Sequence, residues 1–160
     1  MSTAYLGIGS NMDAGRNIRS AISSLSDSFE CAEFSPIYRT RAVGFDGGDF
    51  INLVARVETD KTPLELKRWL HELEDRHDRA RDVPKFSDRT LDIDILLYDD
   101  LWLLSPELEI PRFEILEAAY VLQPLADLAP DLVHPSASKT IALLWSEFPA
   151  GDTRLKPISL

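Results

Sequence analysis

Alternating hydrophobic and polar positions predict several strands along the chain. Residues 50–59 are the clearest case, because apolar residues recur there with the period of two that places them on one face of a strand: Ile51, Leu53, Ala55 and Val57. Similar patterns predict strands at 5–8 and 91–98, and another at 31–38, where Pro36 indicates an edge position or an irregularity. After a turn at Asp99-Asp100, residues 101–104 are expected to pair with 91–98 as a short hairpin.

A helical period marks the segments between these strands. The apolar residues of 18–29 recur at the spacing of an amphipathic helix. A second helix is predicted from Thr62, since Thr62 and Glu65 form a capping box and Pro63 occupies the first helical position. A third is expected over 114–122, with Pro124 limiting it.

The resulting order, β-α-β-β-α-β, predicts an α+β fold of ferredoxin-like type. In this architecture an antiparallel sheet carries helices packed on it, and here a hairpin and helix region would follow at the C-terminal end. The glycine-containing segment 39–49 and the segment 76–88, which has no apolar period, are expected to be loops. No repeat or linker is evident, so residues 1–160 are expected to form one domain.

Charge and composition narrow the class of protein. The chain has 17 Lys+Arg against 27 Asp+Glu, a net charge of −10, which argues against a nucleic-acid binder. The apolar runs are too short to span a membrane, and the first residues do not resemble a secretory leader. A lone cysteine, Cys31, cannot form an internal disulfide, so the cytoplasm is the expected location.

The positive charge is concentrated in one short segment. Residues 76–89 contain five basic residues against three acidic ones, in a chain that is acidic elsewhere. Such a segment would suit a small anion such as a nucleotide phosphate, and the alternative is a solvated, charged helix end.

Two carboxylates stand on the strand that follows this basic segment. Asp92 and Asp94 would share the face opposite Leu91, Ile93, Ile95 and Leu97, roughly 6.5–7 Å apart along the strand. Two like charges so close favour a screening cation, and Mg²⁺ is bound by one or two carboxylates together with nucleotide phosphates. With Arg89 just before them, the pair indicates a phosphoryl-transfer site, whereas the alternative is a solvent-facing Asp-x-Asp.

These residues resemble a known family. The stretch from Arg89 to Leu96 is similar to the signature of the 6-hydroxymethyl-7,8-dihydropterin pyrophosphokinases, and further similar segments occur in the same order at 5–11, 38–40, 50–52 and 121–130. The resemblance implies a ferredoxin-like fold. It also implies transfer of the β,γ-pyrophosphate of ATP to the pterin hydroxymethyl group in folate biosynthesis, with AMP as the other product.

The resemblance implies a role for each site residue. Two Mg²⁺ ions would bind Asp92 and Asp94, and these two aspartates with Arg79 and Arg81 would form the catalytic group. The expected ATP contacts are His71, Glu74, Arg89, Ile95, Arg112 and Phe113. The expected pterin contacts are Thr40, Val43, Gly44, Phe50, Asn52, Phe86 and Tyr120. Small-molecule pterin and ATP would be the only partners, with no nucleic acid and no membrane, and the protein is expected to be a monomer.

The chain also departs from the family pattern. Arg112 and Phe113 stand where the family has His and Tyr, Ala118 replaces an Arg, and Phe86 replaces a Trp. Ser87-Asp88 and Arg41 are further departures. An active enzyme is the leading hypothesis. A pterin- or nucleotide-binding relative without turnover, or an enzyme for a different pterin side chain, are the alternatives.

Overall fold

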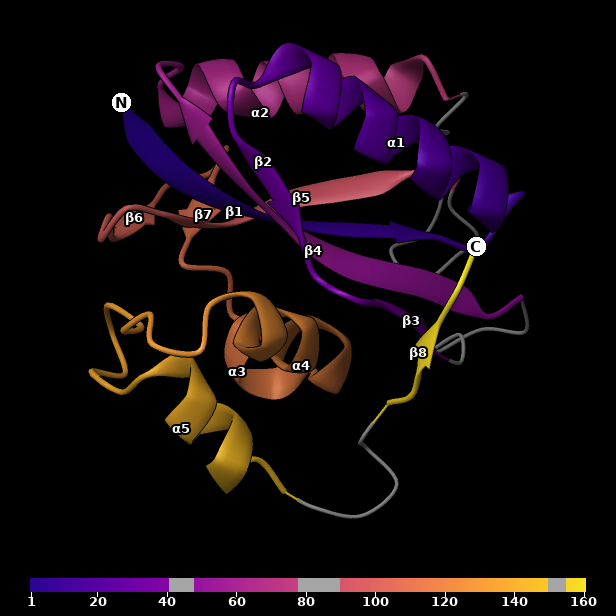
Figure 1. Ribbon diagram of the computed structural model, residues 1–160. Coiled ribbons are helices and arrows are strands. Elements are labelled where there is room, and N and C mark those ends of the chain that lie inside the picture. The colour runs from indigo at the N-terminus through magenta and orange to yellow at the C-terminus, as the bar shows by residue number, and fades with distance from the viewer. Residues whose placement is uncertain (41–47, 78–89, 150–154) are drawn as a thin grey trace.

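The computed structural model describes residues 1–40, 48–77, 90–149 and 155–160 (Figure 1). Its strands are β1 (Ser2–Ser10), β2 (Ala32–Phe34), β3 (Ile37–Thr40), β4 (Phe50–Thr59), β5 (Asp92–Tyr98), β6 (Leu103–Leu104), β7 (Glu109–Ile110) and β8 (Pro157–Ile158). Its helices are α1 (Ala14–Ser28), α2 (Pro63–Asp75), α3 (Glu114–Glu117), α4 (Ala119–Leu128) and α5 (Ile141–Glu147).

The main sheet has the strand order β5-β1-β4-β3-β8, and β2 pairs with β4 on the same side as β3. Every recorded pairing in it is antiparallel. If β2 and β3 are counted as one interrupted strand, the chain runs β-α-β-β-α-β through this sheet. The predicted ferredoxin-like α+β fold is therefore confirmed.

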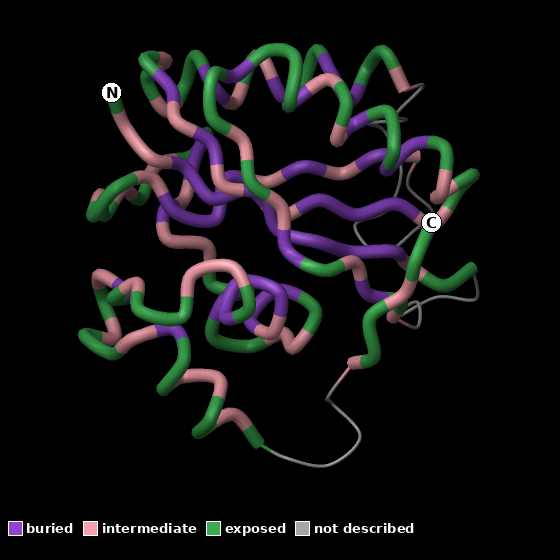
Figure 2. The backbone as a smooth tube through the Cα atoms, in the orientation of Figure 1, coloured by how far each residue is buried: buried purple, intermediate pink, exposed green. Residues whose placement is uncertain are grey.

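The sheet separates two apolar layers (Figures 1 and 2). On one face, alternate residues of β1, β4 and β5 pack with α1 and α2, and this cluster contains the set Ile51, Leu53, Ala55 and Val57 as predicted. On the other face, Tyr5, Val54 and Leu96 pack against α3, α4 and Ile141 of α5. The first face is covered along its length, whereas the second leaves part of the sheet for a site.

Helix α2 begins where its sequence predicts. The Thr62 hydroxyl accepts a hydrogen bond from the Glu65 N–H at 3.3 Å, and the Glu65 carboxylate accepts one from the Thr62 N–H at 2.9 Å. The helix then buries Leu66, Leu70 and Leu73 against the first face. The capping box fixes the start of the helix, and these leucines fix which side faces the sheet.

The single strand predicted for 31–38 is wrong in detail. The structure has two short strands, β2 and β3, separated at Ser35 and Pro36. Pro36 has no N–H to donate, and the Ser35 hydroxyl accepts a hydrogen bond from the Val54 N–H at 2.9 Å. The serine side chain thus satisfies a donor of β4 at the interruption.

The hairpin predicted between 91–98 and 101–104 is also wrong. Strand β6 pairs with β7 in a separate two-stranded sheet. The turn before it bonds to β1 instead, because the Asp99 N–H donates to the Thr3 carbonyl and the Thr3 N–H donates to the Asp99 carboxylate. The chain is thereby directed away from β5.

Two further differences arise from strand pairing and packing. A register shift in the β1–β5 pairing leaves Leu96 as an extra residue, so Leu97 joins the second face and not the face of Ile93 and Ile95 as predicted. The helix predicted for 114–122 divides at Ala118 into α3 and α4, and α4 continues through Pro124 to Leu128. The stabilisation from packing α4 against β4 is larger than the cost of the one backbone hydrogen bond that proline cannot donate.

Helix α5 and strand β8 were not predicted from the sequence. Thr140 caps α5 by accepting a hydrogen bond from the Leu143 N–H at 3.2 Å. Strand β8 extends the sheet beyond β3, and Gln123 of α4 holds Leu155, two residues before β8, through both its N–H and its carbonyl. None of the described helices is long and apolar enough to cross a membrane.

Candidate functional site

The candidate site occupies the uncovered part of the second face, where three adjacent strands carry polar side chains or none. Gly9 of β1 pairs with Asp92 of β5 on one side and with Asn52 of β4 on the other. Residues opposite one another across a ladder point to the same face of a sheet. The acidic pair and Asn52 therefore lie on one surface, separated by a residue without a side chain.

The predicted orientation of the acidic pair is confirmed. Ile93 and Ile95 are buried at 4% and 3% exposure in the first apolar layer, while Asp92 and Asp94 alternate with them and are partly exposed. Strand pairing with β1 holds both aspartates, since Gly9 faces Asp92 and Gly7 faces Asp94.

The amide of Asn52 has a fixed orientation. Its Nδ2 donates to the Thr40 hydroxyl at 2.8 Å, and the side chain is 8% exposed. A Cβ atom at position 9 would lie 2.8 Å from the Asn52 Oδ1, closer than such atoms approach. Glycine at this position is thus required for Asn52 to lie where it does.

Asp94 has the electrostatics of a cation ligand. Desolvation and the neighbouring Asp92 raise its pKa from 3.8 to about 7, against the opposing effect of Arg112. A carboxyl in this state gains from a bound cation, and carboxylate oxygens are the donors that Mg²⁺ prefers. Within the described ranges no group of three or more His, Cys, Asp or Glu could enclose a metal, so Asp92 and Asp94 fit an ion that phosphates and water also ligate.

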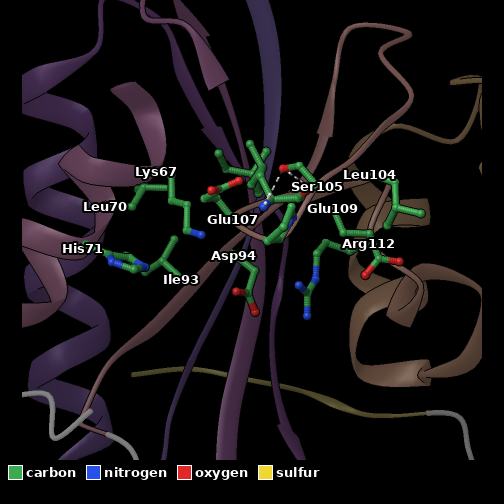
Figure 3. A pocket seen from close by; sticks show the side chains of 13 residues that line it. Lys67, Leu70, His71, Ile93, Asp94, Leu104, Ser105, Glu107, Glu109 and Arg112 are labelled. Atoms are coloured by element: carbon green, nitrogen blue, oxygen red, sulfur yellow. Dashed lines mark hydrogen bonds between the residues drawn. The ribbon is translucent and has the colours of Figure 1, made fainter. Parts of the chain in front are cut away.

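A pocket of about 370 Å³ opens beside Asp94, between α2, β5 and the β6–β7 hairpin (Figure 3). Its lining combines an apolar floor with charged groups of both signs: Lys67, Leu70, His71, Ile93, Asp94, Ile95, Leu104, Ser105, Pro106, Glu107, Leu108, Glu109 and Arg112. Such a cavity has the size and mixed lining of a small-molecule site. Three of the predicted ATP contacts, His71, Ile95 and Arg112, are among these residues.

Arg112 is held at the wall of this pocket. Its backbone N–H donates to the Leu96 carbonyl at 3.0 Å, and its guanidinium lies 5.7 Å from the centre of the Phe113 ring. The guanidinium also binds the Glu114 carboxylate, with the Nε donating at 3.1 Å. Burial acts to lower the pKa of Arg112, but the bond to Glu114 and the charge of Asp94 together outweigh it and raise the pKa. The side chain is therefore a fixed cation.

Phe113, another predicted ATP contact, does not line the pocket and is 41% exposed, and Glu74 also takes a different place. Glu74 is 2% exposed, and its Oε2 accepts a hydrogen bond from the Ile93 N–H at 2.7 Å, on the side of β5 that faces α2. It is not among the residues that line the pocket. Its position supports the strand between the two aspartates, and direct contact with ATP stays a prediction.

Two of the expected pterin contacts, Thr40 and Phe50, lie beside Asn52. Thr40 bonds to it, and Phe50 lies two residues away on the same face of β4. Tyr120 of α4 is 37% exposed, and burial together with the charges of Glu114, Asp92 and Asp94 raises its pKa. The other predicted site residues lie outside the described residues: Val43, Gly44, Arg79, Arg81, Phe86 and Arg89.

Several charged residues of the site were missed by reasoning from the sequence. Lys67, Glu107 and Glu109 line the pocket, and Glu114 binds Arg112. The segment 105–109 has no periodic pattern that would have placed it there. The spacing of Arg112 and Glu114 could have drawn attention to a pair, but only the fold shows that they meet.

The chain is similar to known proteins in sequence and in fold. Residues 5–130 match the family model of 7,8-dihydro-6-hydroxymethylpterin-pyrophosphokinase. The chain is 35% identical over 153 residues to a 2-amino-4-hydroxy-6-hydroxymethyldihydropteridine pyrophosphokinase of Haemophilus influenzae, covering 92% of this chain and 94% of that protein. A protein of the same name from Pseudomonas aeruginosa is 37% identical over 147 residues, covering 88% of each.

Longer relatives contain a similar region. The chain is 34% identical to the folic acid synthesis protein fol1 of Schizosaccharomyces pombe, but it spans only 21% of that protein. A Plasmodium falciparum HPPK-DHPS structure with pteroate has a TM-score of 0.74 at 14% identity, covering 92% of this chain and 44% of that one, which shows the shared fold alone. The family match and the bacterial relatives, each covered over most of its length, place this chain in the 7,8-dihydro-6-hydroxymethylpterin-pyrophosphokinase family.

Proposed function

We propose that this chain transfers pyrophosphate from ATP to the hydroxymethyl group of 6-hydroxymethyl-7,8-dihydropterin, as an ATP-dependent diphosphokinase of folate biosynthesis. The family match and the names of the bacterial relatives support this reaction. In it the pterin hydroxyl oxygen bonds to the β-phosphorus of ATP, the bond from that phosphorus to the α,β-bridging oxygen breaks, AMP leaves, and the hydroxyl proton is released.

The observation that carries the proposal is the juxtaposition of Asp92, Gly9 and Asn52 across three neighbouring strands. Neighbouring strands lie about 4.8 Å apart, so the acidic pair and the Asn52 amide are about 10 Å apart along the sheet. A hydroxyl-bearing ring bound at Asn52 and a triphosphate bound at the aspartates would meet above Gly9. Such positioning supplies much of the rate in phosphoryl transfer.

Each group of residues has a role in this proposal. Asp92 and Asp94 would hold Mg²⁺, as two ions, which neutralises phosphate charge, and the Arg112 guanidinium would contact a phosphate from the wall of the pocket. His71 and Ile95 would line the nucleotide site. Asn52, Thr40, Phe50 and Tyr120 would bind the pterin. Arg79, Arg81 and Arg89 would add positive charge, with Val43, Gly44 and Phe86 around the pterin, as the resemblance implies.

We also propose that residues 1–160 act as one domain and that the protein is a monomer without a nucleic-acid partner. The acidic net charge and the lone, exposed Cys31 support a role in the cytoplasm.

The test is AMP formation from ATP and hydroxymethyldihydropterin with Mg²⁺. We expect Asp94→Asn to lower kcat at least about 1,000-fold while the protein stays folded, because the variant removes a cation ligand but keeps the shape of the side chain. Asp100→Asn, which changes an exposed aspartate in the turn after β5, is the matched control and should retain activity. Tight binding of both substrates without AMP formation by the unaltered protein would favour the non-catalytic alternative instead.

A further inference from the structure

Glu114 binds Arg112 through two atoms of the guanidinium. The Nε donates to one carboxylate oxygen at 3.1 Å, and an Nη donates to the other. Fork-to-fork pairs of this kind fix the plane of the arginine as well as its position. The side chains of Arg112 and Glu114 are only 27% and 19% exposed, so solvent screens the pair less than it would at the surface.

The carboxylates of Asp94, Glu107 and Glu109 line the pocket whose wall holds Arg112. Asp94 and Arg112 both line it and act on each other electrostatically. Figure 3 shows their side chains extending in the same direction from β5 and from the segment before α3. Of the ion pairs recorded for the described residues, that of Arg112 joins it to Glu114 and none joins it to Asp94.

An arginine freed from Glu114 would have Asp94 as an alternative partner. An ion pair between them would occupy the carboxylate that a cation needs and the guanidinium that a phosphate needs. Attraction between opposite charges a few ångströms apart in a partly buried site is large enough to favour this collapse. Contact with Phe113 alone would hold the guanidinium weakly, since an exposed cation–π contact contributes about 0.5–1 kcal/mol.

We propose that Glu114 is a positioning residue: by holding Arg112 at the pocket wall it keeps the guanidinium from pairing with Asp94, so both stay available to ligands. The inference rests on the proposed function, in which Asp94 binds a cation and Arg112 a phosphate. Glu114 itself touches neither ligand and acts through Arg112.

A double-mutant cycle tests this directly. Mn²⁺ binding would be measured by electron paramagnetic resonance, in the presence of an ATP analogue with a methylene group at the α,β-bridge. Four proteins are compared: the unaltered chain, Glu114→Gln, Arg112→Met, and the double variant. We expect Glu114→Gln to weaken Mn²⁺ binding about tenfold, as loss of a residue that supports a ligand does. In the Arg112→Met background the same change should alter binding less than twofold, because no guanidinium remains to occupy Asp94.

Two controls separate positioning from charge. Glu114→Asp keeps the charge but shortens the reach, so it should weaken binding in the same direction, whereas a pure charge effect would leave it unchanged. Glu117→Gln removes an exposed carboxylate from the same helix and should bind Mn²⁺ as the unaltered chain does.

The outcomes distinguish this inference from the proposed function. If Glu114→Gln weakens binding equally in both backgrounds, or not at all, the positioning role is wrong while the cation site stands. If the unaltered chain binds Mn²⁺ no better than Asp94→Asn, the cation site itself is wrong, and the inference is overturned with it.

Discussion

On one face of the sheet, β1, β4 and β5 present mainly apolar side chains to α1 and α2, whereas the other face changes character along its strands. Val54 of β4 and Leu96 of β5 pack in the apolar layer with α4. Two residues earlier on the same strands, Asn52 and Asp94 occupy the same face. The same period of two therefore builds a core on one side and a site on the other.

The difference between the two faces shows where the fold tolerates a desolvated carboxyl beside a like charge. A carboxyl whose pKa is raised by desolvation and by a like charge disfavours its ionised form in the free protein. An unpaired carboxyl would be costly on the first face, where side chains such as Leu6 and Leu53 are fully covered and the buried Glu74 carboxylate accepts a hydrogen bond from the Ile93 N–H. The Asp94 carboxyl persists where covering helices end and a ligand can approach. Substitutions on neighbouring residues should therefore separate stability from activity.

The largest effect on stability is expected at Leu53, which is 1% exposed on the first face. Leu53→Ala should lower the free energy of unfolding by about 2–5 kcal/mol, because it removes buried surface and leaves a cavity. Urea unfolding followed by circular dichroism measures the loss. Its matched counterpart is the preceding residue of the strand, Asn52, which lies on the opposite face. Asn52→Ala should cost only about 1 kcal/mol for the bond to Thr40, yet raise the KM for the pterin.

Equal destabilisation by Leu53→Ala and Asn52→Ala would contradict the division between the two faces. The contrast between these neighbours also indicates which part of the molecule could be predicted from its sequence. The period of two in β4 and the capping box at Thr62 are local signals, and the structure follows both. The β-α-β-β-α-β order follows from such signals taken together.

Features that depend on contacts distant in sequence were not predicted. The register shift that moves Leu97 to the second face arises from pairing with β1, and the β6–β7 pairing arises from a turn that bonds to Thr3. Helix α4 runs through Pro124 because its packing on β4 compensates for a missing donor, which no local rule anticipates.

The site divides in the same way. The shared face of Asp92 and Asp94 follows from strand geometry, and the structure confirms it. The role of Asn52 came from a family resemblance, and its bond to Thr40 could not be read from the sequence. The residues of the β6–β7 hairpin reach the pocket through tertiary packing alone.

A second effect concerns the pH dependence of stability without metal. The pKa of Asp94 is about 7 in the folded protein and near 3.8 when unfolded, so the folded state binds more protons between these values. Its contribution must therefore fall as pH rises from about 4 to 7, by at most about 1.4 kcal/mol per unit. Thermal unfolding of the unaltered chain and of Asp94→Asn, from pH 4.5 to 8, isolates this contribution as the difference between them.

As pH rises, the unaltered chain should lose thermal stability relative to Asp94→Asn. The difference between the two proteins should become constant above about pH 7. A difference that does not change with pH would show that Asp94 is not destabilised in the folded state.

The smallest effect is expected at Gly9, on the boundary between the acidic pair and Asn52. Gly9→Ala places a methyl group 2.8 Å from the Asn52 Oδ1, so the amide must move and the bond to Thr40 weakens. The φ of Gly9 is not in the left-handed region, so the effect is this contact alone. We expect the KM for the pterin to rise about fivefold with little change in the KM for ATP, since the loss of one hydrogen bond, about 1 kcal/mol, corresponds to that factor.

Two comparisons decide whether Gly9 acts through Asn52. Gly7→Ala would meet the flexible end of Leu96 at 3.2 Å, a contact that can relax, and should change the KM for the pterin less than twofold. In an Asn52→Ala background, Gly9→Ala should add nothing, because the amide that it displaces is gone. An additional increase in the KM there would mean that the methyl group obstructs the ligand itself. Gly9 would then be needed to leave room for the pterin and not to orient Asn52.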